Sequence, residues 1–124
     1  IGHGAVLHGC RIGRNAMAGV NAVVLDEAVV GADSIVAALA FVKAGAVIPP
    51  RSLAVGSPAN VLRELSDDEI TWKSRGTAIY QRLALEAPEK LRPAIALTEA
   101  EPDRRRAEAP AYDPKILTWL SGRP

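Results

Sequence analysis

Both histidines of the 124-residue chain lie in one short segment, Ile1–Cys10, where their chemistry can be used together. His3 follows Ile1 by two residues and His8 follows Val6 by two, so we expect them at the same position of consecutive structural repeats. Imidazole nitrogens bind divalent metals, but a catalytic zinc ion usually takes three protein ligands and keeps a fourth position for water. The segment therefore predicts either part of a metal site or two surface histidines at permissive corners.

Cys10 is the third candidate for chemistry, and it is the only cysteine in the chain. Its position in the repeat described below predicts a buried, space-filling thiol rather than a ligand or nucleophile. A single cysteine cannot form an internal disulfide, which favours a reducing cytoplasm. A net charge of +1 and the absence of a long apolar run predict neither nucleic acid nor membrane as a partner.

The segment that must position these residues has a six-residue repeat. Every sixth residue from Val6 is aliphatic: Val6, Ile12, Ala18, Val24, Val30, Val36, Val42, Ile48 and Ala54. Four positions later in each hexad, from Cys10 to Ser52, the residue is small. This pattern predicts a left-handed parallel β-helix over residues 1–59, with three short rungs to each triangular coil and the aliphatic side chains inside.

The corners of the predicted coils are marked by glycine and asparagine. Gly13, Gly19 and Gly31 follow the aliphatic column, with Asn15 and Asn21 nearby, and both residue types tolerate unusual backbone conformations. Between the inward positions runs a second apolar column that should face outward: Met17, Val23, Val29, Ile35, Phe41, Val47 and Leu53. Because apolar exteriors are seldom left to water, we expect a helix and neighbouring subunits to cover them. A homotrimer is the natural closure for a three-sided prism.

The remainder of the chain predicts a helix and a tail. The register should break at Pro49-Pro50, and a turn at Gly56–Ala59 should lead out of the β-helix. Ser66 and Glu69 form a capping box for a C-terminal helix within residues 60–91, which Pro88 should end and which should pack on the β-helix. Residues 92–124 are rich in proline and charge and predict an extended tail.

Several motifs together resemble a known family. They are Ile1–Gly13 (IGHGAVLHGCRIG), Gly56–Ala59 (GSPA), Arg63, Leu65–Glu69 (LSDDE), Trp72-Lys73, Tyr80-Gln81 and Glu99–Arg104. Over about residues 1 to 106 the chain resembles the γ-class carbonic anhydrase-like proteins of the hexapeptide-repeat superfamily. The likeness is strongest to the subgroup that serves phenylacetate and carnitine catabolism, in which substrates are linked to CoA.

The resemblance implies zinc, or another divalent metal, bound at the boundary between two subunits of a homotrimer. His3 and His8 match the family's His-x4-His ligands, and the third ligand is expected upstream of Ile1. Tyr80 matches a family tyrosine that approaches the site, although a tyrosine that packs on a helix face is the simpler interpretation. The implied activity is hydration of CO2, or hydrolysis of an acyl-CoA thioester, by metal-bound hydroxide.

Two alternatives stay open. Many hexapeptide-repeat proteins are CoA-dependent acyltransferases, in which a histidine acts as general base without a metal. The Gly56–Ala59 turn followed by Arg63 resembles the CoA-proximal end of those enzymes. The other alternative is a non-catalytic trimeric accessory protein. These three hypotheses differ in whether His3, His8 or a metal is required for activity.

Overall fold

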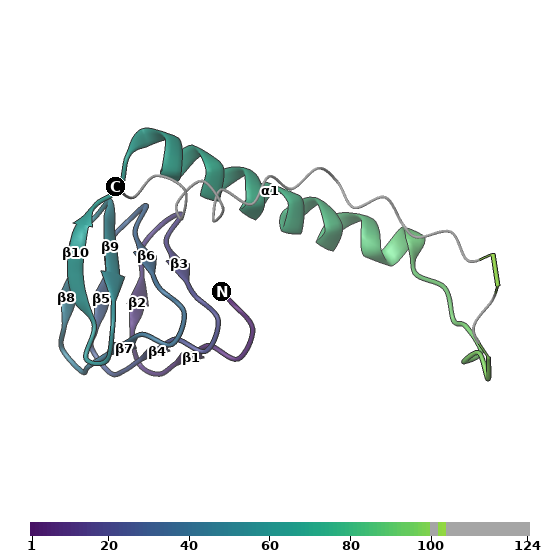
Figure 1. The fold of residues 1–124 in the computed structure, drawn as a ribbon, viewed down its shortest axis with the longest axis horizontal. Helices are drawn as coiled ribbons and strands as arrows, with labels where there is room; N and C mark the ends of the chain where they lie inside the picture. The colour runs from purple at the N-terminus through teal and green to yellow at the C-terminus, as the bar shows by residue number, and fades with distance from the viewer. Residues whose placement is uncertain (100–101, 104–124) are drawn as a thin grey trace. The chain divides into compact units, whose positions relative to one another are not determined.

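A left-handed parallel β-helix forms the main part of the first of two compact units, Ile1–Ala78 (Figure 1). The structure is a computed structural model, and it describes residues 1–99, 102 and 103. The rungs are β1 (Val6–Leu7), β2 (Arg11–Ile12), β3 (Met17–Ala18), β4 (Val23–Val24), β5 (Val29–Val30), β6 (Ile35–Val36), β7 (Phe41–Val42), β8 (Val47–Ile48) and β9 (Ser52–Val55). They stack into three sheets, β1-β4-β7, β2-β5-β8 and β3-β6-β9, and thereby confirm the predicted fold class.

The inward side of the prism holds the two predicted columns. Val24, Val30, Val36 and Val42 are at most 1% exposed, and the small residues Ala22, Ala28 and Ala40 pack with them. The outward column is half-buried along most of its length, but Val47 is exposed and Leu53 is buried. Branched aliphatic side chains and small residues therefore share a thin core, as the repeat predicts.

The register of the first rung differs from the prediction. Leu7 pairs with Val24, 17 residues later, whereas Ile12 pairs with Val30, 18 residues later. Leu7, not Val6, is thus the inward residue of β1. The first coil is therefore one residue shorter than the others, and the shortening falls after β1, between His8 and Cys10.

The corners combine left-handed backbone with close approach between coils. Positive φ angles occur once per corner, at Asn15 (55°), Asn21 (54°), Glu27 (58°), Asp33 (59°), Leu39 (61°) and Arg51 (56°). The glycines that follow the inward column, such as Gly31, meet a different need. A Cβ atom on Gly31 would lie 2.3 Å from the backbone nitrogen of Pro50 in the next coil, so only glycine lets the two coils approach this closely.

The register continues through Pro49-Pro50, contrary to the prediction, because β9 still pairs with β6. In earlier coils the residue at the position of Pro49 donates its N–H to the following coil, as Gly31 does to the carbonyl of Ile48. The chain leaves the β-helix after β9, so this position has no following coil. A proline, which lacks the N–H, is tolerated there.

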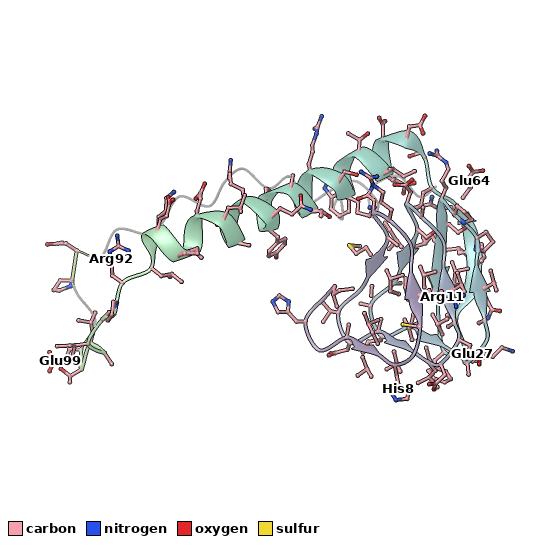
Figure 2. The ribbon with its side chains drawn as sticks, turned by 180° about the vertical axis from the view of Figure 1, so that it is seen from behind. His8, Arg11, Glu27, Glu64, Arg92 and Glu99 are labelled. Carbon is pink, nitrogen blue, oxygen red and sulfur yellow. The ribbon has the colours of Figure 1, made fainter. Side chains whose placement is uncertain are left out.

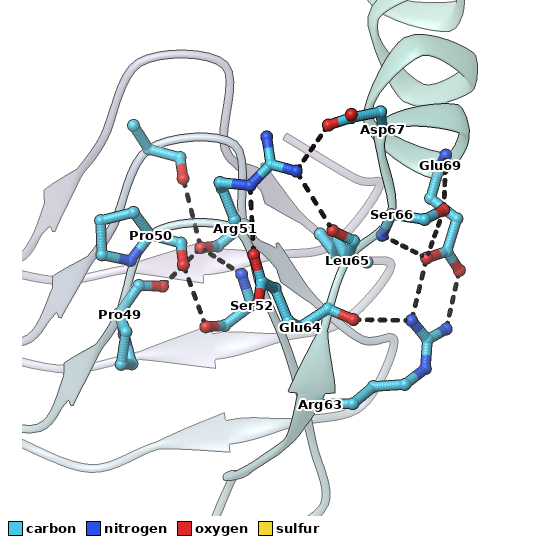
Figure 3. A network of polar contacts seen from close by, with 12 residues as sticks. Pro49, Pro50, Arg51, Ser52, Arg63, Glu64, Leu65, Ser66, Asp67 and Glu69 are labelled. Carbon is cyan, nitrogen blue, oxygen red and sulfur yellow. Dashed lines mark hydrogen bonds and ion pairs between the residues drawn. The ribbon is translucent and has the colours of Figure 1, made fainter.

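A strand and a helix follow the last coil. Residues 60–64, predicted as part of a helical segment, instead form β10 (Asn60–Glu64), which pairs antiparallel with β9. The helix α1 (Asp67–Lys90) then begins at the predicted capping box (Figure 3). The Ser66 N–H donates to Glu69 Oε2 (2.9 Å), and the Glu69 N–H donates to Ser66 Oγ (3.3 Å). Pro88 lies within the last turn, and the helix ends two residues later.

The beginning of α1 covers the edge of the prism between the β2-β5-β8 and β3-β6-β9 sheets. We call the left-handed residues of that edge, Asn15, Asp33 and Arg51, the helix-covered edge. Asn15 Nδ2 donates to Asp33 Oδ1 (2.7 Å) and to Ser74 Oγ (2.9 Å), and Arg51 donates to Asp67 Oδ1 (2.6 Å).

Lys73 is the buried cation of this edge. Its side chain is only 4% exposed, it donates to the carbonyl of Asn15, and burial lowers its pKa. Within this unit the first turns of α1 thus contact the β-helix through Asn15 and Arg51.

The second compact unit, Ile79–Pro124, contains the rest of α1. Glu86 forms i,i+4 ion pairs with Arg82 and Lys90, and the hydrogen bond from Lys90 lowers the pKa of Glu86. Residues 91–97 have no regular secondary structure, and most of the predicted tail, residues 100, 101 and 104–124, lies outside the described residues. No helix in the described part of the chain is long and apolar enough to cross a membrane.

Candidate functional site

The shortened corner after β1 brings His8 and Asp26 together. The Glu27 N–H donates to the Gly9 carbonyl (2.8 Å), as the Asp33 N–H donates to the Arg14 carbonyl, so Gly9 stacks on Asp26 and Glu27 has no counterpart in the coil above. His8 comes directly before this shortened corner, and its backbone N–H donates to the Val24 carbonyl (2.9 Å). His8 Nδ1 lies 3.0 Å from Asp26 Oδ2.

Gly9 is required for this contact. Its φ is +57°, and a Cβ atom on Gly9 would lie 2.6 Å from Asp26 Oδ1. Any other residue would displace the carboxylate that His8 contacts. Gly9 thus leaves room for the Asp26 carboxylate to lie beside the ring of His8.

The electrostatics of the pair define the state of the imidazole. The hydrogen bond from His8 lowers the pKa of Asp26, so the carboxylate is ionised near neutral pH and can only accept. His8 Nδ1–H must therefore be the donor, and in the neutral ring Nε2 carries a lone pair. With side chains 70% and 56% exposed, the pair presents that lone pair to solvent, where it can take a proton or bind a cation.

A shallow hollow lies beside the pair and is lined by Gly9, Arg11 and Glu27. Arg11 projects outward from β2, and Glu27 is the left-handed residue of the corner after β4. In Figure 2 the labelled side chains of His8 and Glu27 project away from the coils at the lower edge of the view. We call His8, Asp26 and Glu27 the histidine edge.

His3 lies on another edge, so the predicted equivalence of the two histidines is wrong. The His3 carbonyl accepts from Asn21 N–H (2.9 Å), as the Arg14 carbonyl accepts from Asp33, whereas His8 donates its own N–H to the next coil. The strand β1 separates the two histidines, and His3 stacks with Val20 at the corner between the β3-β6-β9 and β1-β4-β7 sheets. The cause is the shortening, which follows β1 instead of preceding it.

A complete metal site is not formed by the residues that the structure describes. Nowhere in residues 1–99, 102 and 103 do three His, Cys, Asp or Glu side chains gather to hold an ion. A single chain thus contributes His8 with Asp26 at one edge and His3 at another. Their assignment as metal ligands stays a prediction.

The remaining predicted residues fall in three different places. Cys10 is partly buried and packs against the core, as predicted. Arg63 forms a two-pronged ion pair with Glu69 (2.9 and 2.7 Å), which places its guanidinium at the start of α1 (Figure 3). Tyr80 lies in the second unit with its side chain 69% exposed, and its catalytic role stays a prediction.

Sequence reasoning missed Asp26, Arg11 and Glu27. The signal for Asp26 lay in the coil length, because residues 17 apart lie one above the other before the shortened corner and Asp26 is 17 residues after Gly9, the neighbour of His8. The repeat also marks Arg11, the one charged residue in an otherwise apolar outward column. Both residues are found only when the sequence is aligned coil by coil, so that residues of successive coils can be compared at each position.

Comparison with solved structures defines the class of protein. A crystal structure of a hexapeptide transferase family protein from Anaplasma phagocytophilum matches with a TM-score of 0.66 and 33% identity, over 68% of this chain and 51% of that one. A proposed acetyltransferase from Bacillus cereus matches with a TM-score of 0.62 and 35% identity, over 63% of this chain and 45% of that one. The chain is therefore a hexapeptide-repeat protein.

Comparison with curated proteins is more specific. The chain is similar to the carnitine operon protein CaiE of Salmonella agona, with 50% identity over 106 residues, and of Escherichia coli K12, with 47% identity over 108 residues. These alignments cover 86% and 87% of this chain but 54% and 55% of the relatives, so the chain spans about half their length. It is a CaiE-like hexapeptide-repeat chain. No family model matches it.

Proposed function

We propose that this chain carries the general base of a CoA-dependent acyltransferase, with His8 as the base and Asp26 as the residue that orients it. The observation that carries the proposal is the 3.0 Å contact between His8 Nδ1 and Asp26 Oδ2, which directs the Nδ1 proton of the exposed ring toward the carboxylate and makes Nε2 the basic nitrogen of the neutral ring. The printed names of the two structural relatives, a transferase family protein and a proposed acetyltransferase, support the same class of reaction.

The reaction needs little more than a positioned base. His8 Nε2 takes the proton of an acceptor hydroxyl or amine, and the acceptor atom forms a bond to the thioester carbonyl carbon. The carbon–sulfur bond then breaks, and the CoA thiolate takes the proton back from the imidazolium. The Asp26 carboxylate holds the ring in the tautomer that can act as a base and stabilises the imidazolium while it exists.

The proposal includes a homotrimer. At the corner between the β3-β6-β9 and β1-β4-β7 sheets, His3 is exposed beside Val20 (46% exposed) and Leu39 (72% exposed). Leu39 also has a φ of +61°, which is unfavourable for a branched side chain, and in one chain it gains no burial in return. Contact with a second copy would bury this edge.

The test is release of CoA thiol from acetyl-CoA in the presence of small alcohols and amines, among them 3-aminopropan-1-ol. We expect acceptor-dependent release that resists a metal chelator, falls at least a hundredfold in His8→Ala and is unchanged in His3→Ala. The folded fraction of each variant is checked by circular dichroism. Release that is equally fast in His8→Ala, or that is absent with every acceptor, would overturn the proposal.

A second candidate, a zinc or other divalent-metal site, is favoured by one specific observation. Metal-bound histidines usually donate their other ring N–H to a carboxylate, and His8 does so to Asp26. His3 and His8 lie on different edges, so they would bind one ion only if two chains of a trimer contribute one histidine each. Such a metal would supply a hydroxide for CO2 hydration or acyl-CoA thioester hydrolysis.

Metal content separates the two candidates. In the metal hypothesis, zinc bound by the oligomer disappears in both His3→Ala and His8→Ala, and a chelator removes activity. In the acyltransferase hypothesis, only His8→Ala lowers activity and the chelator has no effect. Zinc retained at full occupancy in either alanine variant would contradict the metal assignment.

A further inference from the structure

Arg11 and Glu27 depart from the repeat at one place, the hollow beside His8. The outward residue of each rung from Val6 to Leu53 is apolar, except for the charged residue Arg11 in β2. The left-handed corner position holds glycine, asparagine, Leu39, or a charged residue whose side chain is bonded to a neighbour, such as Asp33 and Arg51. Among the charged residues at left-handed corners of the described part of the chain, Glu27 is the one whose side chain makes no such bond.

The two charges do not satisfy each other. Arg11 and Glu27 line the same hollow, both are exposed, and neither side chain has a hydrogen bond or ion pair among residues 1–99, 102 and 103. Asp26, the nearest other carboxylate in the sequence, is already engaged by His8. A free guanidinium and a free carboxylate therefore face one small space whose floor is the backbone of Gly9.

The backbone of Glu27 adds a second indication. A glutamate with a φ of +58° is strained, since only glycine and asparagine adopt this region readily. The Glu27 N–H donates to the Gly9 carbonyl, and the same left-handed backbone recurs at the other corners, but the side chain of Glu27 is exposed and has no hydrogen bond or ion pair within the described residues. No side-chain contact therefore offsets the strain at Glu27.

We propose that Arg11 and Glu27 form a mixed-charge subsite that binds the acyl acceptor as a zwitterion. Glu27 binds the ammonium group, Arg11 binds the carboxylate, and the hydroxyl or second amine of the same molecule lies at His8 Nε2. Guanidinium groups match the planar carboxylate, which gives the subsite its polarity. This inference rests on the proposed function for the role of His8, but the binding of the zwitterion does not require catalysis.

Three matched probes test the subsite. L-Homoserine carries both charges, 3-aminopropan-1-ol is the same molecule without its carboxylate, and 4-hydroxybutanoate is the same molecule without its ammonium group. Binding to the chain is measured at low salt by chemical-shift titration, with no acyl donor present. We expect L-homoserine to bind about tenfold more tightly than either single-charge probe, since each hydrogen-bonded charge adds roughly that factor.

Two variants assign the charges. Glu27→Gln should weaken the binding of L-homoserine and of 3-aminopropan-1-ol about tenfold and leave the binding of 4-hydroxybutanoate unchanged. Arg11→Gln should weaken the binding of L-homoserine and of 4-hydroxybutanoate about tenfold and leave the binding of 3-aminopropan-1-ol unchanged. Arg14→Gln and Glu64→Gln, at exposed positions of the first unit that do not line the hollow, are the matched controls and should change nothing. Equal binding of all three probes, or insensitivity of L-homoserine to both variants, would overturn the subsite.

The measurements distinguish failure of the subsite from failure of the proposed function. Charge-selective binding without any acetyl transfer would support the subsite and contradict the acyltransferase. Chelator-resistant transfer that depends on His8 but is indifferent to the charges of the acceptor would support the acyltransferase and contradict the subsite. Both results are read from the same purified chain and variants.

Discussion

The helix-covered edge and the histidine edge are built from the same corner of the repeat but end in opposite states. On the helix-covered edge, Asn15 and Arg51 donate to side chains of α1, and Lys73 of α1 donates back to Asn15. On the histidine edge only His8 and Asp26 are bonded, and Glu27 faces solvent. Stacked corners can therefore serve either to hold an element in place or to present groups to a ligand.

The difference comes from the lengths of the corners. The helix-covered edge keeps the full corner in every coil, so its left-handed residues stack 18 residues apart and present a continuous polar row to the helix. The histidine edge loses one residue after β1, which opens the space where the ring of His8 reaches Asp26. A single deletion in a regular scaffold thus creates the one irregular polar pair.

The largest expected effect is on catalysis at the histidine edge. In Asp26→Asn the amide can donate to His8 Nδ1, which places the remaining proton on Nε2 and removes the base. We expect acyl transfer to fall about a hundredfold or more. Asp33→Asn, the same change on the helix-covered edge, should leave the activity of folded protein unchanged. Equal losses in the two variants, measured as CoA release per folded molecule, would mean that the edges do not differ in function.

The next effect is on stability and compares two glycines. Gly31→Ala, on the helix-covered edge, forces a Cβ atom to within 2.3 Å of the Pro50 backbone and should lower the free energy of unfolding by about 3 kcal/mol. Gly45→Ala, at a histidine-edge corner with φ +69° and open space around it, should cost only about 1 kcal/mol for backbone strain. Urea denaturation measures both. A larger loss in Gly45→Ala would show that conformation, rather than close approach, limits the repeat.

A smaller effect concerns the cap that starts the covering helix. The hydrogen bonds from Arg63 lower the pKa of Glu69 from 4.5 to about 2, so the carboxylate is charged more readily in the folded chain. Its contribution to stability is present above about pH 4.5 and is lost as the pH falls toward 2.

Glu69→Gln tests this pH dependence directly. The variant should lose about 1 kcal/mol at neutral pH, since Arg63 is partly hydrated, and it should flatten the change in stability between these pH values. The control Glu64→Gln removes an exposed carboxylate that pairs with Arg51 and should keep the slope. An unchanged slope in Glu69→Gln would assign the acid sensitivity to other groups.

Much of the scaffold could be predicted from the sequence, because its signals are local and repeated. The inward column, the small residues and the Ser66–Glu69 capping box each follow from side-chain size or hydrogen-bonding chemistry at fixed spacing. Which residue of the first rung faces inward could not be predicted from these signals. Val6 and Leu7 are both apolar, so the pattern alone does not say which of them points inward, and pairing with Val23 and Val24 decides it.

The candidate site was predicted only in part. His8 was identified by residue type, but its partner Asp26 lies on another coil, and the assumed equivalence with His3 depended on the wrong phase. The strand at residues 60–64 was also missed, since pairing with β9 rather than local pattern forms it. Contacts between coils, and not the repeat itself, determine both features.

The smallest expected effect is that of Glu27→Gly, which is compared with the same exchange at Asn15 on the other edge. Glu27→Gly should stabilise the chain by under about 1 kcal/mol, because the strain at φ +58° is relieved and no bond within the described residues is lost. Asn15→Gly should instead destabilise it by about 1 to 2 kcal/mol, because the hydrogen bonds to Asp33 and Ser74 disappear. Opposite signs in urea denaturation would show that the histidine edge retains strain that the helix-covered edge offsets with bonds. If Glu27→Gly destabilises as much as Asn15→Gly, Glu27 has a structural partner, and the contrast between the two edges fails at that residue.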